Sequence, residues 1–380
     1  MPGSFGGTAA ESRPAAAVPF PNCRRVMPFL CSSKFLPPPE FVTDAYNTGV
    51  NVGVIGLGFM GAVHLSAYAK IAGASVAAVC SGGSKNFTGD LSEVGGNLAR
   101  EPVRFDFSAV RKYTDWKELV ADPSVEVVDI CLPTDLHAAV TVAALENGKH
   151  VLCEKPMALT VPECERMMAA AAQQKRVLMI GQVLRFWPEY EELKKLVQSG
   201  EYGSIRSATF VRRSGLPDWS RWLTDESRSG GAVLDLMLHD VDQALSLFGM
   251  PQRVAAKSMG DPDTVMATLI YPGGPEVRIQ GGWFAPGTPF SMSFQVRADR
   301  AELEWTPAGL FLSDDTGQRR KLDVSSADAY ESELAYFLEC CHNGEQPRRC
   351  MPFESAAAVK LALLLKESRA KGGEQLECLV

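Results

Sequence analysis

The stretch Val50-Asn51-Val52-Gly53-Val54-Ile55-Gly56-Leu57-Gly58-Phe59-Met60-Gly61 decides the fold of this chain. Residues 50–55 have the apolar pattern of a buried strand, and residues 62–71 are typical of a helix. The glycines between them form Gly-x-Gly-x-x-Gly, in which the first makes a tight turn, the second admits a pyrophosphate and the third allows close helix packing. The helix N-terminus then offers amide donors to the phosphates. We therefore predict a dinucleotide site at Gly56, Gly58, Phe59, Met60 and Gly61, with a plain tight turn as the alternative.

The end of the next strand, residues 75–80, bears on which dinucleotide is bound. An Asp or Glu is expected there when the adenosine ribose of NAD is held. The chain has Ser81-Gly82-Gly83-Ser84-Lys85 instead, and these hydroxyls, amides and lysine suit a 2′-phosphate. We predict NADP, with NAD still possible, and contacts from Ser81, Gly82 and Lys85. The alternative is a flexible surface loop whose lysine faces only water.

Alternating strands and helices continue from this motif and indicate a parallel sheet with right-handed crossovers. Thr134 and Thr160 are placed to cap two of the helices. The expected elements are helices at 115–121, 135–146 and 160–174, and strands at 125–132 and 177–183. We predict a Rossmann-type, doubly wound dinucleotide-binding domain at 48–180.

The pattern changes after residue 180 to short strand-like runs separated by Gly, Pro and Asp. These runs predict a C-terminal α+β domain, 181–380, for substrate binding and oligomerisation, built on a large, mostly antiparallel sheet. The expected strands are 205–213, 264–271, 276–283, 290–296, 301–305 and 309–313, and the expected helices are 188–198, 231–248, 327–342 and 353–369. The last helix is apolar enough to pack back on the first domain. Residues 1–47 are rich in Pro, Ala, Gly and Ser and are expected to be a disordered extension. The alternatives are an organelle-targeting segment, a tail without function, or a start codon set too far upstream, with Met27 as the true start.

Composition narrows the class of protein. The chain has 380 residues, is 46% hydrophobic and carries a formal net charge of −7, which argues against a nucleic-acid partner. No apolar run reaches the roughly 20 residues of a membrane-spanning helix. The ten cysteines are scattered without Cys-x-x-Cys, so we expect neither a disulfide framework nor a metal site. A reducing, cytoplasmic location fits best.

Two further stretches carry candidate chemistry. In His150-Val-Leu-Cys-Glu-Lys-Pro156 a short strand ends at Glu154 and Lys155, and the proline holds the lysine in extended backbone. The ammonium could donate to a substrate oxygen, although an ordinary surface ion pair is the alternative. After Gly230-Gly231, Asp235 and His239 are four residues apart and are expected on one helix face, with His239 as a general base. The alternative is a polar stripe on an amphipathic helix.

With these motifs together, residues 50–378 resemble the glucose-fructose oxidoreductase / inositol dehydrogenase / rhizopine catabolism (Gfo/Idh/MocA) family. The similarity rests on Gly56-x-Gly-x-x-Gly-x-x-His64, Leu132-Pro-Thr-x-x-His137, Glu154-Lys-Pro156 and Gly230-Gly-x-x-x-Asp235-x-x-x-His239-x-x-Asp242. The resemblance implies NAD(P)-dependent hydride transfer between the nicotinamide and a secondary alcohol or ketone of a sugar, cyclitol or related polyol. It also implies a catalytic set of Lys155, Asp235 and His239 and a cis Lys155–Pro156 bond. A carbonyl reductase, a dihydrodiol dehydrogenase and a non-catalytic NAD(P)-binding sensor remain alternatives.

The resemblance and the neighbouring loops complete the candidate site. The expected cofactor contacts include Leu132, Pro133, His137, Glu154 and Lys155. Candidate substrate contacts, besides Asp235 and His239, are Arg185, Trp219, Arg221 and Trp222. A homodimer or homotetramer formed through the C-terminal sheet is expected, with Val277, Ile279 and Gly281 alternating along one strand and Trp283, Phe284 and Phe290 as exposed apolar surface.

Overall fold

The computed structural model describes residues 49–97 and 102–378, except for the side chains of Ser84 and Lys85. All of these residues belong to one compact unit. The extension predicted to be disordered, residues 1–47, lies outside the described part. Within that part, no helix has the length and apolar character needed to cross a membrane.

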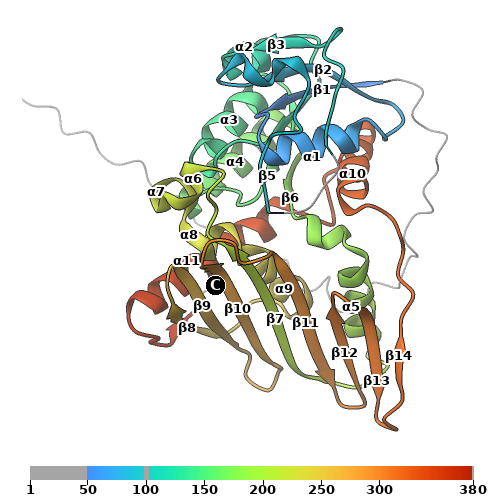
Figure 1. Cartoon of the computed structure of the whole chain (residues 1–380), viewed down its shortest axis with the longest axis vertical. Helices are drawn as coiled ribbons and strands as arrows, with labels where there is room; N and C mark the ends of the chain where they lie inside the picture. Colours follow the sequence, from blue (N-terminus) through green and yellow to red (C-terminus); the bar gives the residue numbers. More distant parts are fainter. Residues whose placement is uncertain (1–48, 98–101, 379–380) are drawn as a thin grey trace, which may run out of the picture. The chain divides into compact units, whose positions relative to one another are not determined.

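The first sheet is parallel and has six strands in the order β3-β2-β1-β4-β5-β6 (Figure 1). Its strands are β1 Val50–Ile55, β2 Ala74–Cys80, β3 Arg111–Tyr113, β4 Val127–Ile130, β5 His150–Glu154 and β6 Leu178–Gly181. This is the strand order of dinucleotide-binding doubly wound folds, in which the order reverses between β1 and β4. The Rossmann architecture predicted from the Gly-x-Gly-x-x-Gly stretch is therefore confirmed.

Helices cover both faces of this sheet because successive strand residues point to opposite sides. Val52 and Val54 contribute to a core shared with α1 (Phe59–Tyr68) and α10 (Ala329–Asn343). Val128 and Ile130 face the other core, with α3 (Thr134–Glu146) and α4 (Val161–Gln174). The short helix α2 spans Trp116–Ala121, and a 3-10 turn, η3, spans Ser84–Thr88. Buried residues on both faces of β1, β4, β5 and β6 explain the continuous hydrophobic runs there.

The two predicted threonine caps have different outcomes. Thr160 caps α4 as expected, in a capping box in which its hydroxyl accepts from the Glu163 amide and the Glu163 carboxylate accepts from the Thr160 amide. The prediction for Thr134 is wrong. Pro133 occupies the N-cap position of α3, and Thr134 is already the first helical residue, with a buried hydroxyl.

The second sheet has nine strands in the order β14-β13-β12-β11-β7-β10-β9-β8-β15. Only β7 and β10 pair in parallel among its described strands. The strands are β7 Ile205–Gly215, β8 Arg253–Gly260, β9 Asp263–Ile270, β10 Glu276–Phe284, β11 Ser291–Ala298, β12 Ala301–Thr306, β13 Gly309–Asp314, β14 Arg319–Lys321 and β15 Leu376–Glu377. The mostly antiparallel sheet was predicted, whereas strands β3, β8, β14 and β15 were missed.

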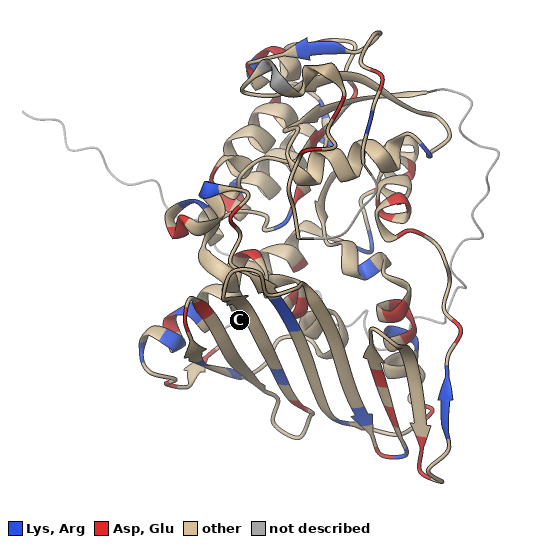
Figure 2. Ribbon diagram, in the orientation of Figure 1, with Lys and Arg blue, Asp and Glu red and all other residues tan. Residues whose placement is uncertain are grey.

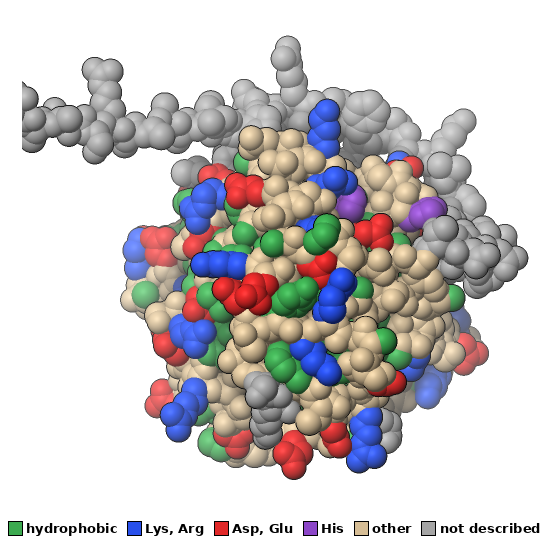
Figure 3. Space-filling view, turned by 90° about the horizontal axis from the view of Figure 1, so that it is seen from above, with side chains coloured by type: hydrophobic (Ala, Val, Ile, Leu, Met, Phe, Trp, Pro, Cys, Tyr) green, Lys and Arg blue, Asp and Glu red, His purple; other side chains and the backbone are tan. Residues whose placement is uncertain are grey.

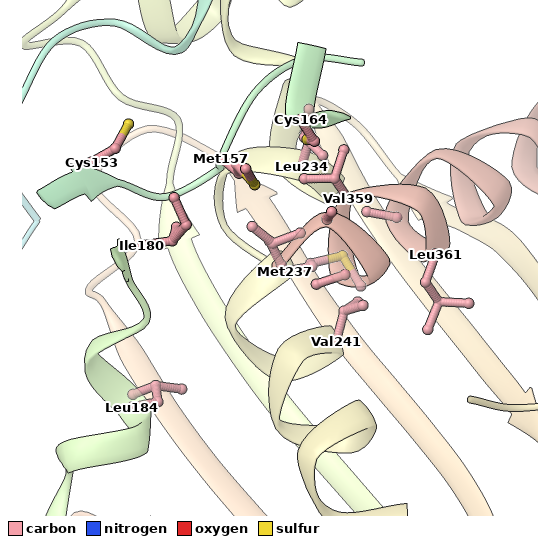
Figure 4. Close-up of a cluster of buried hydrophobic side chains, with 14 of the residues drawn as sticks. Cys153, Met157, Cys164, Ile180, Leu184, Leu234, Met237, Val241, Val359 and Leu361 are labelled. Atoms are coloured by element: carbon pink, nitrogen blue, oxygen red, sulfur yellow. The ribbon is translucent and has the colours of Figure 1, made fainter. Parts of the chain in front are cut away.

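One face of the nine-stranded sheet packs against helices α5 (Pro188–Ser199), α9 (Leu238–Phe248) and α11 (Pro352–Ala370) (Figure 1). The last helix also contacts α4 and β6, as expected of a helix that packs back on the first sheet. Figure 4 shows side chains of the first sheet beside those of C-terminal helices: Cys153 and Ile180 lie with Met237, Val241 and Val359 in one buried cluster. This shared core fixes the carboxyl ends of β5 and β6 relative to α8 and α9.

The helix expected over 231–248 is interrupted. Helix α8 spans Gly231–Asp235, and α9 begins at Leu238 after a turn at Leu236 and Met237. The break ends the i,i+4 relation between Asp235 and His239, so the prediction that they lie on one helix face is wrong. Asp235 and His239 can therefore contact different groups.

Candidate active site

A cleft of about 780 Å³ opens at the carboxyl ends of β1, β4 and β5. Parallel strands bring these ends to one edge of the sheet, and the strand-order reversal between β1 and β4 separates the loops that follow. The cleft is lined by Gly56, Gly58, Phe59, Met60, Leu132, Pro133, Glu154 and Lys155 from this edge, and by Trp219, Trp222, Asp235 and His239 from the C-terminal part. Most residues expected in the site are thus brought together.

The glycine loop has the shape that a dinucleotide pyrophosphate requires. Gly56 has φ +101°, and a Cβ there would lie 2.3 Å from the Cys131 carbonyl oxygen. A Cβ on Gly61 would lie 1.9 Å from the Gly56 carbonyl oxygen, so this glycine allows α1 to pack against the turn. A Cβ on Gly58 would meet no atom within 4 Å, and Gly58 lines the cleft at the start of α1. Open space beside helix amide groups fits a bound phosphate.

The residues expected to select NADP follow the end of β2. Ser81 is half-buried and Gly82 is exposed, and neither lines the cleft. The Lys85 side chain lies outside the described part of the chain. The wall here is made by Asn86, Thr88 and Asp90, which the sequence reasoning missed. Asn86 donates to the Leu57 carbonyl at 2.8 Å, which ties this segment to the glycine loop.

Lys155 follows the end of β5 and is followed by a cis peptide bond to Pro156, as the family resemblance implied. Its backbone amide donates to Oε2 of Glu154 at 3.0 Å. The other oxygen, Oε1, lies 3.1 Å from Nε2 of His64, whose Nδ1 bonds Oδ2 of Asp129 at 2.8 Å. His64 is fully buried, and although burial lowers its pKa, Asp129 and Cys131 raise it well above the usual value. An imidazolium between two carboxylates thus holds Glu154 at the cleft wall.

Other buried polar groups lie near His64. Nδ1 of His64, Sγ of Cys131 and a carboxylate oxygen of Asp129 lie within 4.8 Å of one another, a spacing that a metal could use. The 2.8 Å separation of the nitrogen and the oxygen is that of a charge-assisted hydrogen bond, and we assign a hydrogen-bonded cluster. Glu333 of α10 is fully buried nearby, and burial raises the pKa of its carboxyl group well above the usual value, reinforced by Glu154.

Asp235 pairs with Lys155 and not with His239. The lysine Nζ donates to the Asp235 carbonyl oxygen at 2.7 Å and lies 3.5 Å from its Oδ1. The expectation that Asp235 orients His239 is therefore wrong, because the break between α8 and α9 turns the carboxylate toward the lysine. Asp235 instead fixes where the Lys155 ammonium sits in the cleft.

His239 lies at the start of α9 beside this pair. Burial lowers its pKa well below the ordinary value of 6.5, and the positive charges of Lys155 and Arg212 lower it further. Its Nδ1 is buried and has no hydrogen-bond partner among the described residues. The imidazole is therefore neutral at pH 7 and can accept a proton, which is the state a general base needs.

Two predicted contacts lie outside the cleft. His137 is buried, with its ring nitrogens 2.7 Å from the Pro156 carbonyl and 2.8 Å from the Leu132 carbonyl, so it ties together two cleft loops without lining the cleft. Arg185 forms a bidentate pair with Asp242 at 2.8 and 2.7 Å and also contacts Glu354. A guanidinium with these partners is structural, so the assignment of Arg185 to the substrate is not supported.

The cleft lining also contains residues that the sequence did not suggest, from β7, β11, α10 and the segments just before α5 and β11. They are Trp187, Arg212, Phe290, Met292 and Tyr330. The sequence pattern could have identified Arg212. It follows Ala208 and Phe210 at every second position of β7, on the face that points inward, where a charged residue is unexpected. It is 2% exposed and makes a bidentate pair with Asp240 at 2.9 and 3.0 Å. Arg221 is exposed and does not line the cleft.

Comparison with known proteins places the chain in context. Residues 50–182 match the oxidoreductase family with an NAD-binding Rossmann fold, and residues 190–304 match the Gfo/Idh/MocA C-terminal domain. The levoglucosan dehydrogenase of Pseudarthrobacter phenanthrenivorans is 36% identical over 208 residues, 53% of this chain and 51% of the relative, so the chain spans about half of that relative's length. The myo-inositol 2-dehydrogenase of Thermotoga maritima is 27% identical over 86% of this chain and 97% of its own length.

The fold is shared with a solved levoglucosan dehydrogenase in complex with NADH and levoglucosan. The TM-score is 0.74 at 22% identity, with 87% of this chain and 99% of that chain covered. The two family models together match more than half of the chain, in the order of the two sheets. The chain belongs to the Gfo/Idh/MocA family of NAD-binding oxidoreductases.

Proposed function

We propose that this protein catalyses NAD(P)-dependent hydride transfer between a secondary alcohol and the corresponding ketone. Lys155 and His239 are the catalytic residues, and Asp235 is a positioning residue. The observation that carries the proposal is that a paired ammonium and a neutral, half-buried imidazole line the same cleft as the glycine loop. A sensor that binds the dinucleotide without turnover needs no such proton-transfer set. The sugar and cyclitol relatives support an alcohol on a ring as the substrate.

Each residue has a role that its contacts support. The Lys155 ammonium donates to the substrate oxygen and stabilises the negative charge that develops on it. His239 takes the hydroxyl proton during oxidation and returns it during reduction. Asp235 holds the Lys155 ammonium in position through its carbonyl and carboxylate oxygens. Gly56 and Gly58 of the glycine loop would hold a nicotinamide dinucleotide by its pyrophosphate, and that cofactor would supply the redox chemistry as hydride acceptor or donor.

Replacement of His239 tests this function. Activity of the wild type should persist at pH 6.5 and fall only well below it, because burial, Lys155 and Arg212 lower the pKa of His239 and protonation at acidic pH removes the base. His239→Ala should lower kcat by roughly 10²–10⁴-fold and flatten that acidic limb, while cofactor affinity stays near the wild-type value. The matched control is His342→Ala, at an exposed histidine of α10. Retention of turnover and of the limb in His239→Ala would contradict the proposal.

We infer that NADP is preferred over NAD. The support is the absence of an acid at Ser81 and the presence of Lys85 in the same loop, which removes repulsion of a 2′-phosphate. Isothermal titration with both cofactors should show tighter binding of NADP, and Ser81→Asp should reverse the order. An NAD preference of tenfold or more in the wild type, about 1.4 kcal/mol, is the result that rejects this inference.

A further inference from the structure

We propose, resting on the dehydrogenase function above, that Arg212 is a specificity-determining residue whose Nη1 donates a hydrogen bond to a second oxygen of the substrate, beside the oxygen that reacts. Arg212 lies on β7, on the face of the nine-stranded sheet that packs against α9. It lines the same cleft as Lys155 and His239. The hydride and proton transfer assigned to that pair leaves this cation without a role.

Asp240 and Tyr190 hold one side of the guanidinium. Nε donates to Oδ2 of Asp240 at 2.9 Å, and Nη2 donates to Oδ1 at 3.0 Å and to the Tyr190 hydroxyl at 3.3 Å. All three residues are buried, and neither Asp240 nor Tyr190 lines the cleft. Because two parallel hydrogen bonds to one carboxylate fix the plane of a guanidinium, these buried partners set the direction in which Nη1 points.

Nη1 is the end of the guanidinium that has no oxygen acceptor among the described residues. Its acceptor is the sulfur of Met292 at 3.1 Å, and Met292 faces Arg212 directly across the pairing of β7 and β11. A thioether is a weak acceptor, and Nη1 carries two N–H groups. Met292 lines the cleft, whereas Asp240 and Tyr190 do not, so the nitrogen with spare donor capacity is the one on the cleft side.

The location of Arg212 relative to the reacting groups suits contact with a neighbouring oxygen. Asp240, which holds the guanidinium, directly follows His239 on α9. The positive charges of Lys155 and Arg212 both lower the pKa of His239, so both cations lie near the imidazole. A substrate whose reacting oxygen lies between Lys155 and His239 then presents an oxygen on a neighbouring carbon to Nη1. Since Asp240 already balances the charge of the guanidinium, this acceptor can be an uncharged hydroxyl.

Initial rates on matched alcohols test the contact. The polyol turned over fastest among myo-inositol, levoglucosan and trans-cyclohexane-1,2-diol is compared with its monodeoxy analogues, which for the diol is cyclohexanol. In the wild type, the analogue without the hydroxyl that Nη1 contacts should lose about tenfold or more in kcat/KM, the effect of one lost hydrogen bond to a charged donor. Equal kcat/KM for the polyol and every reacting analogue would overturn the contact and leave the dehydrogenase function intact. Failure of every alcohol, and of cyclohexanone in the reverse direction, would overturn the function itself.

Arg212→Lys connects this discrimination to Nη1. Lysine keeps a cation beside Asp240 but lacks the second arm of the guanidinium, so the loss of kcat/KM caused by the missing hydroxyl should become several-fold smaller. The acidic limb assigned to His239 should stay in place, because the nearby positive charge is retained. Arg185→Lys is the matched control, since that guanidinium makes the same kind of pair with Asp242 outside the cleft, and it should leave the discrimination unchanged. Full discrimination in Arg212→Lys would overturn the proposal.

A second variant leaves Arg212 in place and so tests the contact even where Arg212→Lys does not fold. Met292→Glu puts a carboxylate beside Nη1, which takes up the donor that the substrate needs, and the discrimination should again fall several-fold. Met266→Glu, at an exposed methionine of β9, is the control and should keep the wild-type discrimination. Wild-type discrimination in a folded Met292→Glu protein is the result that would reject a contact from Nη1.

Discussion

At the scale of single residues, the site depends on which partner each charged side chain has. Asp235 and Lys155 are 80 positions apart in the chain and form one unit in the cleft. His239 is left with a neutral ring, because burial and two nearby cations oppose its protonation. We therefore assign charge stabilisation to Lys155 and proton transfer to His239.

Asp235→Asn tests this division. The change should lower kcat by roughly 10²-fold, because the Lys155 ammonium loses an ionic partner and shifts relative to the substrate oxygen. The midpoint of the acidic limb should stay where it is, because Asp235 is not among the groups that shift the pKa of His239. The measurement is kcat/KM from pH 5 to 8 for both proteins. A clear fall of the midpoint in the variant would restore the alternative in which Asp235 orients His239.

At the scale of elements, the turn from β1 into α1 combines two different uses of glycine. Position 61 has no room for a side chain because the Gly56 carbonyl packs against it. Position 58 borders the open cleft, where a side chain would meet no protein atom but would occupy the space expected for the pyrophosphate. Gly58→Ala should therefore weaken dinucleotide binding by tenfold or more and leave the melting temperature within about 1–2 °C of the wild type, since no protein atom is displaced.

Gly61→Ala is the comparison for that prediction. Its methyl group would overlap backbone, so both the melting temperature and the cofactor affinity should fall. Thermal unfolding and isothermal titration of the two variants separate the effects. If Gly58→Ala binds NADP and NAD as tightly as the wild type does, the pyrophosphate does not approach this glycine.

At the scale of the whole molecule, acidic residues outnumber basic ones by 45 to 38. On the side that Figure 3 shows, basic and acidic side chains are interspersed. Figure 2 shows few charged residues along the central strands of the nine-stranded sheet. The residues on its face away from the helices include Thr209, Val211 and Ser293, which alternate with buried Phe210 and Phe294.

The homo-oligomer through this sheet stays a prediction, but its surface must be corrected. Val277, Ile279 and Trp283 are buried against the helices and offer no free apolar face. The opposite face, around Val211, is the candidate interface. Val211→Glu should convert a dimer or tetramer into smaller species, because an unpaired carboxylate is costly to bury. Ala139→Glu, at an exposed position of α3, is the control. Light scattering that shows a wild-type monomer at micromolar concentration would contradict the prediction.

The sequence by itself determined the local structure and the cofactor loop. Strand and helix periods, the Thr160 capping box and the Gly-x-Gly-x-x-Gly setting depend on residues close together in the chain, so their physics is readable locally. The same holds for the placement of Lys155 at a strand end. These features sufficed for the Rossmann sheet, the mostly antiparallel second sheet and most of the cleft.

Only the tertiary structure decided which side chains pair with one another in and around the cleft. Arg185 binds Asp242 from 57 positions away and leaves the site, while Arg212, Met292 and Tyr330 enter it from separate elements. The turn at Leu236 and Met237 sends Asp235 to Lys155. A hydrogen bond between distant segments depends on how the core packs them together, and no local pattern encodes that choice.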